Sequence, residues 1–169
     1  MVMSVQETQV RPAAEGTGLT AAAAATAYAG ALPLLVGAIL AWARPADLAT
    51  FILPIMTTMG IALLAFFGGV RWGVAVMGNK GPTFRQLAGS VVPMVLAIAL
   101  FQIDGIVTVL TALSVLIPLL LLDDLRATRR GSGAPEWYLG VRVPLTIMME
   151  VSFVAALILA LTHESLSAL

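Results

Sequence analysis

The chain alternates between long runs of apolar residues and short polar segments rich in charge, proline and glycine. Five apolar runs reach the length of about 20 residues that a helix needs to cross roughly 30 Å of hydrocarbon. They lie at about 19–43, 48–77, 84–103, 105–122 and 143–162. The pattern predicts an all-α protein, a single polytopic bundle of five transmembrane helices over residues 19–169, preceded by a polar tail at 1–18 that we expect to be mobile.

The segments between the runs carry the residues that end helices. Arg44-Pro45-Ala46-Asp47 follows the first run, and Gly78-Asn79-Lys80-Gly81-Pro82 follows the second. Only Asp104 and Gly105 separate the third run from the fourth. We therefore expect these two helices to form a tight antiparallel hairpin with an acidic tip.

The composition supports a membrane protein and excludes several functions. Hydrophobic residues make up 60% of the chain, charged residues 11%, and the mean hydropathy is +1.00; a soluble domain is about 25% charged. Nine basic residues balance nine acidic ones, so no basic face for nucleic acid is predicted. Without cysteine, with one histidine and without a catalytic motif, the chain predicts no enzyme, no catalytic residue, no metal and no cofactor. Bound lipid is compatible with this composition.

Basic residues predict the orientation. With five spans, seven of them fall on one side, and only Arg44 falls on the other: the seven are Arg11, Lys80, Arg85, Arg126, Arg129, Arg130 and Arg142. Because basic residues are retained inside, we expect a cytoplasmic N-terminus and a periplasmic C-terminus, in a bacterial inner membrane.

Aromatic and basic residues near the span ends are candidate contacts with the lipid surface. Trp72, Trp137 and Tyr138 are predicted interfacial anchors. Arg126, Arg129, Arg130 and Arg142 are positive-inside charges and candidate contacts for lipid head groups. A docking site for a partner or for a cardiolipin-like lipid is the alternative for this polar loop.

Glycines in the first two spans allow close helix contact. Gly69 and Gly73 form a small-xxx-small step, and Gly60 and Gly68 recur after about two turns. The candidate helix-packing or docking residues are Gly30, Gly37, Gly60, Gly68, Gly69 and Gly73. Packing inside the bundle and a homodimer seam are both consistent with them.

Two ionisable residues inside apolar runs require a partner or water, because a charge at the bilayer centre costs about 2.5–3.5 kcal/mol or more. They are Arg71 and Glu150. We expect an ion pair between them, or Arg71 extending to the head groups beside Trp72. The alternatives for Glu150 are a neutral acid bonded to Tyr28, Thr57, Thr58 or Thr146, or a carboxylate lining a small polar cavity.

Several motifs resemble an uncharacterised family of small bacterial inner-membrane proteins. They are Tyr28-Ala29-Gly30-Ala31-Leu32-Pro33, Phe67-Gly68-Gly69-Val70-Arg71-Trp72-Gly73, Ser90-Val91-Val92-Pro93 and the segment 135–146 around Trp137-Tyr138 and Arg142. The family is a domain of unknown function that includes the mitochondrial transmembrane protein number sixty-nine. The resemblance implies a five-helix bundle in an energy-transducing membrane and implies no activity.

Two functions from different classes fit these observations. The first is an accessory subunit or assembly factor that docks on a larger respiratory or photosynthetic membrane complex, with membrane lipids as its other partners. The alternative is a binder or carrier of a lipid, quinone or tetrapyrrole, with a polar intramembrane pocket lined by Arg71, Trp72, Tyr28 and Glu150. A membrane enzyme is a third reading, for which the chain offers no nucleophile paired with a base or metal.

Overall fold

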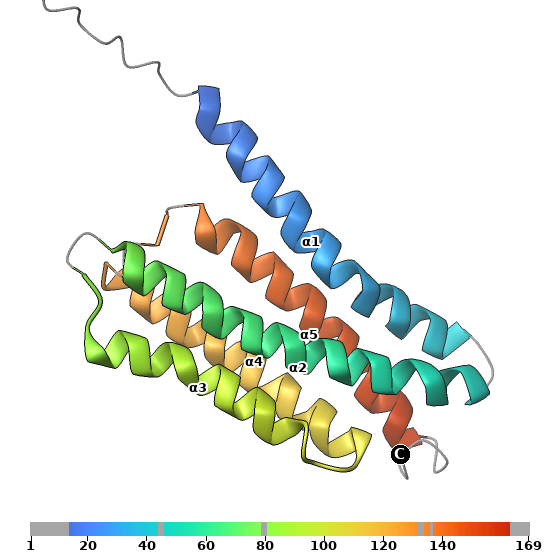
Figure 1. Cartoon of the computed structure of the whole chain (residues 1–169). Helices are drawn as coiled ribbons and strands as arrows, with labels where there is room; N and C mark the ends of the chain where they lie inside the picture. The colour runs from blue at the N-terminus through green and yellow to red at the C-terminus, as the bar shows by residue number, and fades with distance from the viewer. Residues whose placement is uncertain (1–13, 44–45, 79–80, 132–133, 136, 163–169) are drawn as a thin grey trace, which may run out of the picture.

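Five α-helices make up the part of the chain that the structure, a computed structural model, describes: residues 14–43, 46–78, 81–131, 134–135 and 137–162. They are α1 (Ala14–Ala43), α2 (Ala46–Met77), α3 (Phe84–Leu100), α4 (Ile106–Arg129) and α5 (Tyr138–Thr162). Successive helices run in opposite directions (Figure 1). The ends of α2 and α4 and the start of α5 therefore lie at one end of the bundle, which we call the α5-start end.

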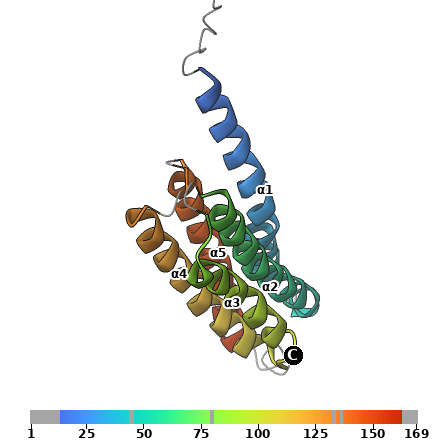
Figure 2. The same cartoon turned by 60° about the vertical axis from the view of Figure 1, so that its left-hand side comes forward.

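Helix α2 is the central helix and contacts each of the other four. Its most extensive contact is with α3, while α5 packs between α1 and α4. The N-terminal part of α1 extends past the other helices (Figures 1 and 2).

The third and fourth spans do not pack against each other as the tight hairpin that the sequence predicts. Helix α3 lies along α2 rather than along α4. Gly68 of α2 explains this, because a Cβ atom there would lie only 2.7 Å from the backbone oxygen of Ser90 in α3. The missing side chain lets the two helix backbones approach closely.

Local chemistry accounts for the helix ends. The Thr83 hydroxyl accepts a hydrogen bond from the Gln86 amide at 3.3 Å, and the Gln86 side chain accepts one from the Thr83 amide at 2.9 Å, which completes a capping box before α3. Gly105 before α4 and Gly131 after it have φ of +102° and +76°, a region that favours glycine.

The observed helices differ from the predicted spans mainly at their polar ends. Helix α1 begins within the expected tail, whose residues 1–13 lie outside the described part of the chain. Helix α4 continues seven residues past 122, to Arg129, and α5 starts at Tyr138 rather than 143. Both extensions carry charged residues that find partners on neighbouring helices, as described below, so the helices do not stop where the apolar runs stop.

Four of the helices are long and apolar enough to cross a membrane: α1, α2, α4 and α5. Helix α3 is apolar but has 17 residues, a length of about 26 Å. The outer surface of the bundle suits lipid, because large apolar side chains are exposed on every helix, among them Ile39, Phe51, Ile98, Leu119 and Leu161.

The core is built from apolar side chains of all five helices, with Ala97 and Leu100 as the contribution of α3. Phe153, Leu113 and Leu64 are fully buried within it. Gly60 lies directly against this core, since a Cβ atom there would come within 2.6 Å of Leu113 and 2.8 Å of Phe153.

Adjacent glycines in α2 provide a test of the packing between α2 and α3. Gly68→Ala should lower the free energy of unfolding by about 1–3 kcal/mol, because the new methyl group overlaps the Ser90 carbonyl. Gly69→Ala is the matched control, because no atom lies within 4 Å of the position its Cβ would take. Thermal unfolding in detergent measures both, and equal unfolding temperatures for the two variants would contradict the close contact.

Candidate functional site

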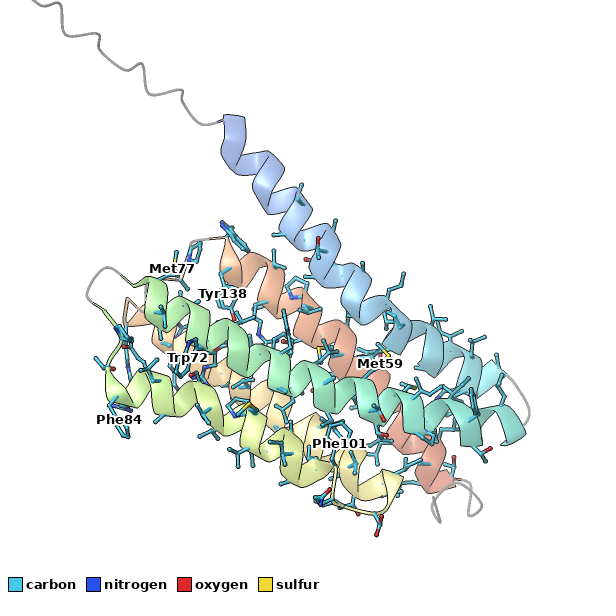
Figure 3. All side chains as sticks on the ribbon, viewed as in Figure 1. Met59, Trp72, Met77, Phe84, Phe101 and Tyr138 are labelled. Carbon is cyan, nitrogen blue, oxygen red and sulfur yellow. The ribbon has the colours of Figure 1, made fainter. Side chains whose placement is uncertain are left out.

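Charged side chains from three helices meet at the α5-start end. Arg71 comes from α2, Asp123 and Asp124 from α4, and Arg142 from α5, where it follows Tyr138 by one turn. Figure 3 shows Tyr138 at the same end of the bundle as Trp72 and Met77 of α2. We call these five residues, Arg71, Asp123, Asp124, Tyr138 and Arg142, the ionic cluster.

Arg142 is the most deeply buried charge of the ionic cluster, with 2% of its side chain exposed. Its Nε lies 3.3 Å from Asp124 Oδ2, and its Nη1 donates to the Thr146 hydroxyl at 2.8 Å. The guanidinium also stacks on the Phe67 ring of α2, with 3.5 Å between Cζ and the ring centroid. Nη2 is buried and has no hydrogen-bond partner.

Asp124 connects the two arginines. Its Oδ2 faces Arg142 and accepts a hydrogen bond from the Tyr138 hydroxyl at 3.3 Å, while its Oδ1 lies 3.2 Å from Arg71 Nε. Asp124 is only 5% exposed. Arg71 also pairs with Asp123, whose side chain is 58% exposed. One carboxylate thus holds α2, α4 and α5 together.

The charges of the ionic cluster cancel, with two arginines against two aspartates. Buried charges lose their hydration, so they are tolerated only when paired and hydrogen-bonded. Removing one partner of a buried pair leaves the other uncompensated and costs about 3–5 kcal/mol. The pairing of these charges therefore fixes the positions of α2, α4 and α5 relative to one another. In the described part of the chain no group of three or more His, Cys, Asp or Glu side chains is arranged to hold a metal ion.

The expected ion pair between Arg71 and Glu150 is wrong. Arg71 is 19% exposed and pairs with Asp123 and Asp124. Glu150 lies two turns deeper along α5 than Arg142, and its Oε1 is buried without a hydrogen-bond partner. At the level of Arg71, α4 presents two aspartates, which are closer partners than an acid two turns away.

The hydroxyl groups proposed as partners for Glu150 bond to the backbone instead. Thr57 and Thr58 donate to the carbonyl of Pro54, and Thr146 donates to the carbonyl of Arg142. Tyr28 of α1 is half-buried against the core and is not part of the ionic cluster.

The predicted contact of Arg142 with lipid head groups is wrong, because Arg142 is buried and paired with Asp124. Tyr138 is half-buried and also bonds to Asp124, so it is more than an interfacial anchor. Trp72 and Trp137 are 46% and 42% exposed. The remaining candidate head-group contacts are exposed at the end of α4: Arg126, Arg129 and Arg130.

The six glycines separate into two groups. Gly37, Gly60 and Gly68 lie against neighbouring helices, with another residue's atoms within 3.1 Å of where a Cβ would be. A Cβ at Gly30, Gly69 or Gly73 would meet no atom within 4 Å. Gly30, Gly69 and Gly73 therefore face outward and leave space beside the helix for another molecule.

Asp123 and Asp124 are the residues of the ionic cluster that the sequence analysis missed, and only the buried one, Asp124, leaves a signal in the sequence. The signal for it is the helical spacing of the buried face of α4, where Leu113, Ile117 and Leu120 are followed by Asp124 at intervals of three or four residues. Arg142 continues the buried face of α5 in the same way, with Leu145 and Met149. A charge that falls on such a face requires an opposite charge on a neighbouring helix.

A double-mutant cycle tests which acid pairs with Arg71. The free energy lost on Arg71→Met should be the same with and without Glu150→Gln, and should shrink by about 0.5–3 kcal/mol when Asp124→Asn is already present. Unfolding of the purified protein in detergent measures these losses. A loss that shrinks with Glu150→Gln and not with Asp124→Asn would restore the pair with Glu150.

Comparison with known proteins identifies a relative and a protein family. Transmembrane protein 69 of Xenopus tropicalis is 33% identical over 102 residues, which are 59% of this chain and 39% of that protein. This chain thus spans well under half the length of that relative, and together with the apolar helices the similarity indicates a multi-pass membrane protein. No solved structure matches the chain significantly. The protein family of unknown function DUF3429 matches residues 19–158, so the chain belongs to this family.

Proposed function

We propose that this protein is a non-enzymatic inner-membrane protein that docks, as an accessory subunit or assembly factor, on a larger respiratory or photosynthetic complex. The outward-facing pair Gly69 and Gly73 on α2 supports this proposal. The two glycines are one helical turn apart, both are exposed, and the space beside each is open. Small residues at this spacing let a helix of another protein approach the backbone closely.

The ionic cluster supports a structural role for the polar groups. The charged side chains of the ionic cluster pair with one another: Arg71 with Asp123 and Asp124, and Arg142 with Asp124. Arg142 also contacts the Phe67 ring and donates a hydrogen bond to Thr146. A bundle stiffened in this way presents the outward face of α2 in a fixed position. Pre-organised surfaces lose less conformational entropy on binding.

The proposed orientation places the N-terminus and the α5-start end in the cytoplasm, with all five helices crossing a bacterial inner membrane. The exposed arginines at the end of α4 support it, because basic residues near span ends remain inside. The chain has no cysteine, so Arg130→Cys and Asp104→Cys each introduce a single reporter. In intact cells an impermeant thiol reagent should label the second variant and not the first; the reverse pattern would invert the topology.

The docking face is tested in native membranes solubilised in mild detergent. The unsubstituted chain should migrate in native gels far above its mass of 17.6 kDa. Gly69→Leu with Gly73→Leu should release it from the complex, because larger side chains then project from a face where the added Cβ atoms meet nothing of the bundle within 4 Å. Thermal unfolding should be unchanged by the two substitutions.

Gly140→Leu is the matched control for docking. Gly140 is also an exposed helical glycine with open space beside it, but it lies on α5. This variant should stay in the complex. Migration of the unsubstituted chain solely as a free monomer would contradict the proposed function, and retention of the Gly69→Leu, Gly73→Leu variant would exclude this face as the docking surface.

A further inference from the structure

A groove between α3 and α4 ends at the ionic cluster. It remains open because α3 packs along α2 rather than along α4. The groove has a volume of about 180 Å³. Its walls include Val92 and Leu96 of α3 and Leu116 and Leu119 of α4, with Arg71 and Asp123 at its polar end.

The apolar part of the groove is long enough for an acyl chain. A second hollow on α4 shares Leu116 with it and continues as far as Thr108. Helix α4 rises about 22 Å between Asp123 and Thr108. One leaflet contributes half of the roughly 30 Å of hydrocarbon in a bilayer, so a chain that enters beside Asp123 can follow α4 through its whole leaflet.

Two exposed arginines continue the wall of the groove beyond its polar end. Arg126 and Arg130 follow Leu119 and Asp123 by seven residues, which is two helical turns, so they lie on the same face of α4. Arg129 follows Leu122 at the same spacing, and Leu122 does not line the groove. Two of the three exposed arginines at this end of α4 therefore lie above the groove, and the third lies on another face.

The charges at this end favour an anion. Arg71 pairs with Asp123, and Arg142 pairs with Asp124, so the ionic cluster is neutral. In the part of the chain that the structure describes, no carboxylate pairs with Arg126 or Arg130. The excess positive charge thus lies at the head-group end of an apolar groove, and both arginines are accessible from outside the bundle.

We propose that this groove binds an anionic phospholipid. The phosphate lies beside Arg126 and Arg130, and one acyl chain lies between α3 and α4 along Val92 and Leu119. Charge selects the head group, because basic residues near the membrane surface attract anionic lipids. The site goes beyond the proposed docking role, and neither Gly69 nor Gly73 lines it.

Native mass spectrometry of the delipidated protein in detergent tests the choice of head group. The unsubstituted chain should bind one phosphatidylglycerol at least tenfold more tightly than phosphatidylcholine with the same acyl chains. Arg126→Gln should weaken the binding of phosphatidylglycerol about fivefold, the effect of one basic residue near an anionic surface. Arg129→Gln is the matched control and should leave the affinity unchanged, because it removes the same charge from another face of α4.

A second pair of variants tests the position of the acyl chain. Val92→Trp should fill the groove and weaken the binding of phosphatidylglycerol at least tenfold. Val95→Trp is the matched control, because Val95 lies one turn further along α3 and is exposed to the same extent, 55% against 53%, but does not line the groove. Leu119→Trp fills the groove from α4 and replaces Val92→Trp if that variant does not fold.

Four results would overturn the proposal. They are equal affinities of the unsubstituted chain for the two lipids, equal weakening by Arg126→Gln and Arg129→Gln, equal binding by Val92→Trp and Val95→Trp, and displacement of the lipid by an equal concentration of inorganic phosphate. The last result would assign the arginines to a free anion. Because the titration uses purified protein, loss of the docking complex in native membranes does not affect its outcome.

Discussion

The bundle depends on one carboxylate. Asp124 of α4 is shared by Arg71 of α2 and Arg142 of α5, at the end of the bundle where these helices come together. The side chains of Asp124 and Arg142 are only 5% and 2% exposed, so loss of either partner leaves the other as an unpaired buried charge. The hydroxyl of Tyr138 and the ring of Phe67 complete the surroundings of the two buried groups.

Away from the ionic cluster, a hydrogen bond and close packing hold the helices together. At the opposite end, the Trp42 side chain donates a hydrogen bond to the Ala155 carbonyl and links α1 to α5. In the middle of the bundle, Gly60 allows Phe153 and Leu113 to pack against α2, and Gly68 allows α3 to approach it. Within a membrane such close packing replaces the hydrophobic effect as the main source of helix association. Ionic contacts at one end and tight packing elsewhere together leave α2 as the fixed centre.

The sequence predicts the helices well because their signal is local. A run of apolar residues is sufficient to place a helix, and the five predicted runs coincide with the five helices. The helix ends were misplaced where charged residues continue a helix beyond its apolar run, as in α4 and α5. The contact between α3 and α2 also escaped prediction, since a short loop suggests that sequential helices are neighbours but does not establish it.

The ionic cluster was only partly predictable. The sequence predicts that Arg71 requires a partner, and the structure confirms it. Depth in the membrane does not tell which helix faces Arg71, so the sequence does not distinguish Asp124 from Glu150. The spacing of Asp124 and Arg142 along the buried faces of their helices contains the missing information. Which of the six predicted glycines face outward could not be foreseen, because this depends on how α1 and α2 are placed relative to the neighbouring helices.

Side-chain NMR of the arginines in detergent micelles measures whether Arg142 is buried against Asp124. If Arg142 is buried against Asp124, its Nε proton should exchange with water far more slowly than those of the exposed Arg126, Arg129 and Arg130, and its resonance should shift on Asp124→Asn. Exchange of the Arg142 proton at the rate of the exposed arginines, with no shift on Asp124→Asn, would show that Arg142 is not buried against Asp124.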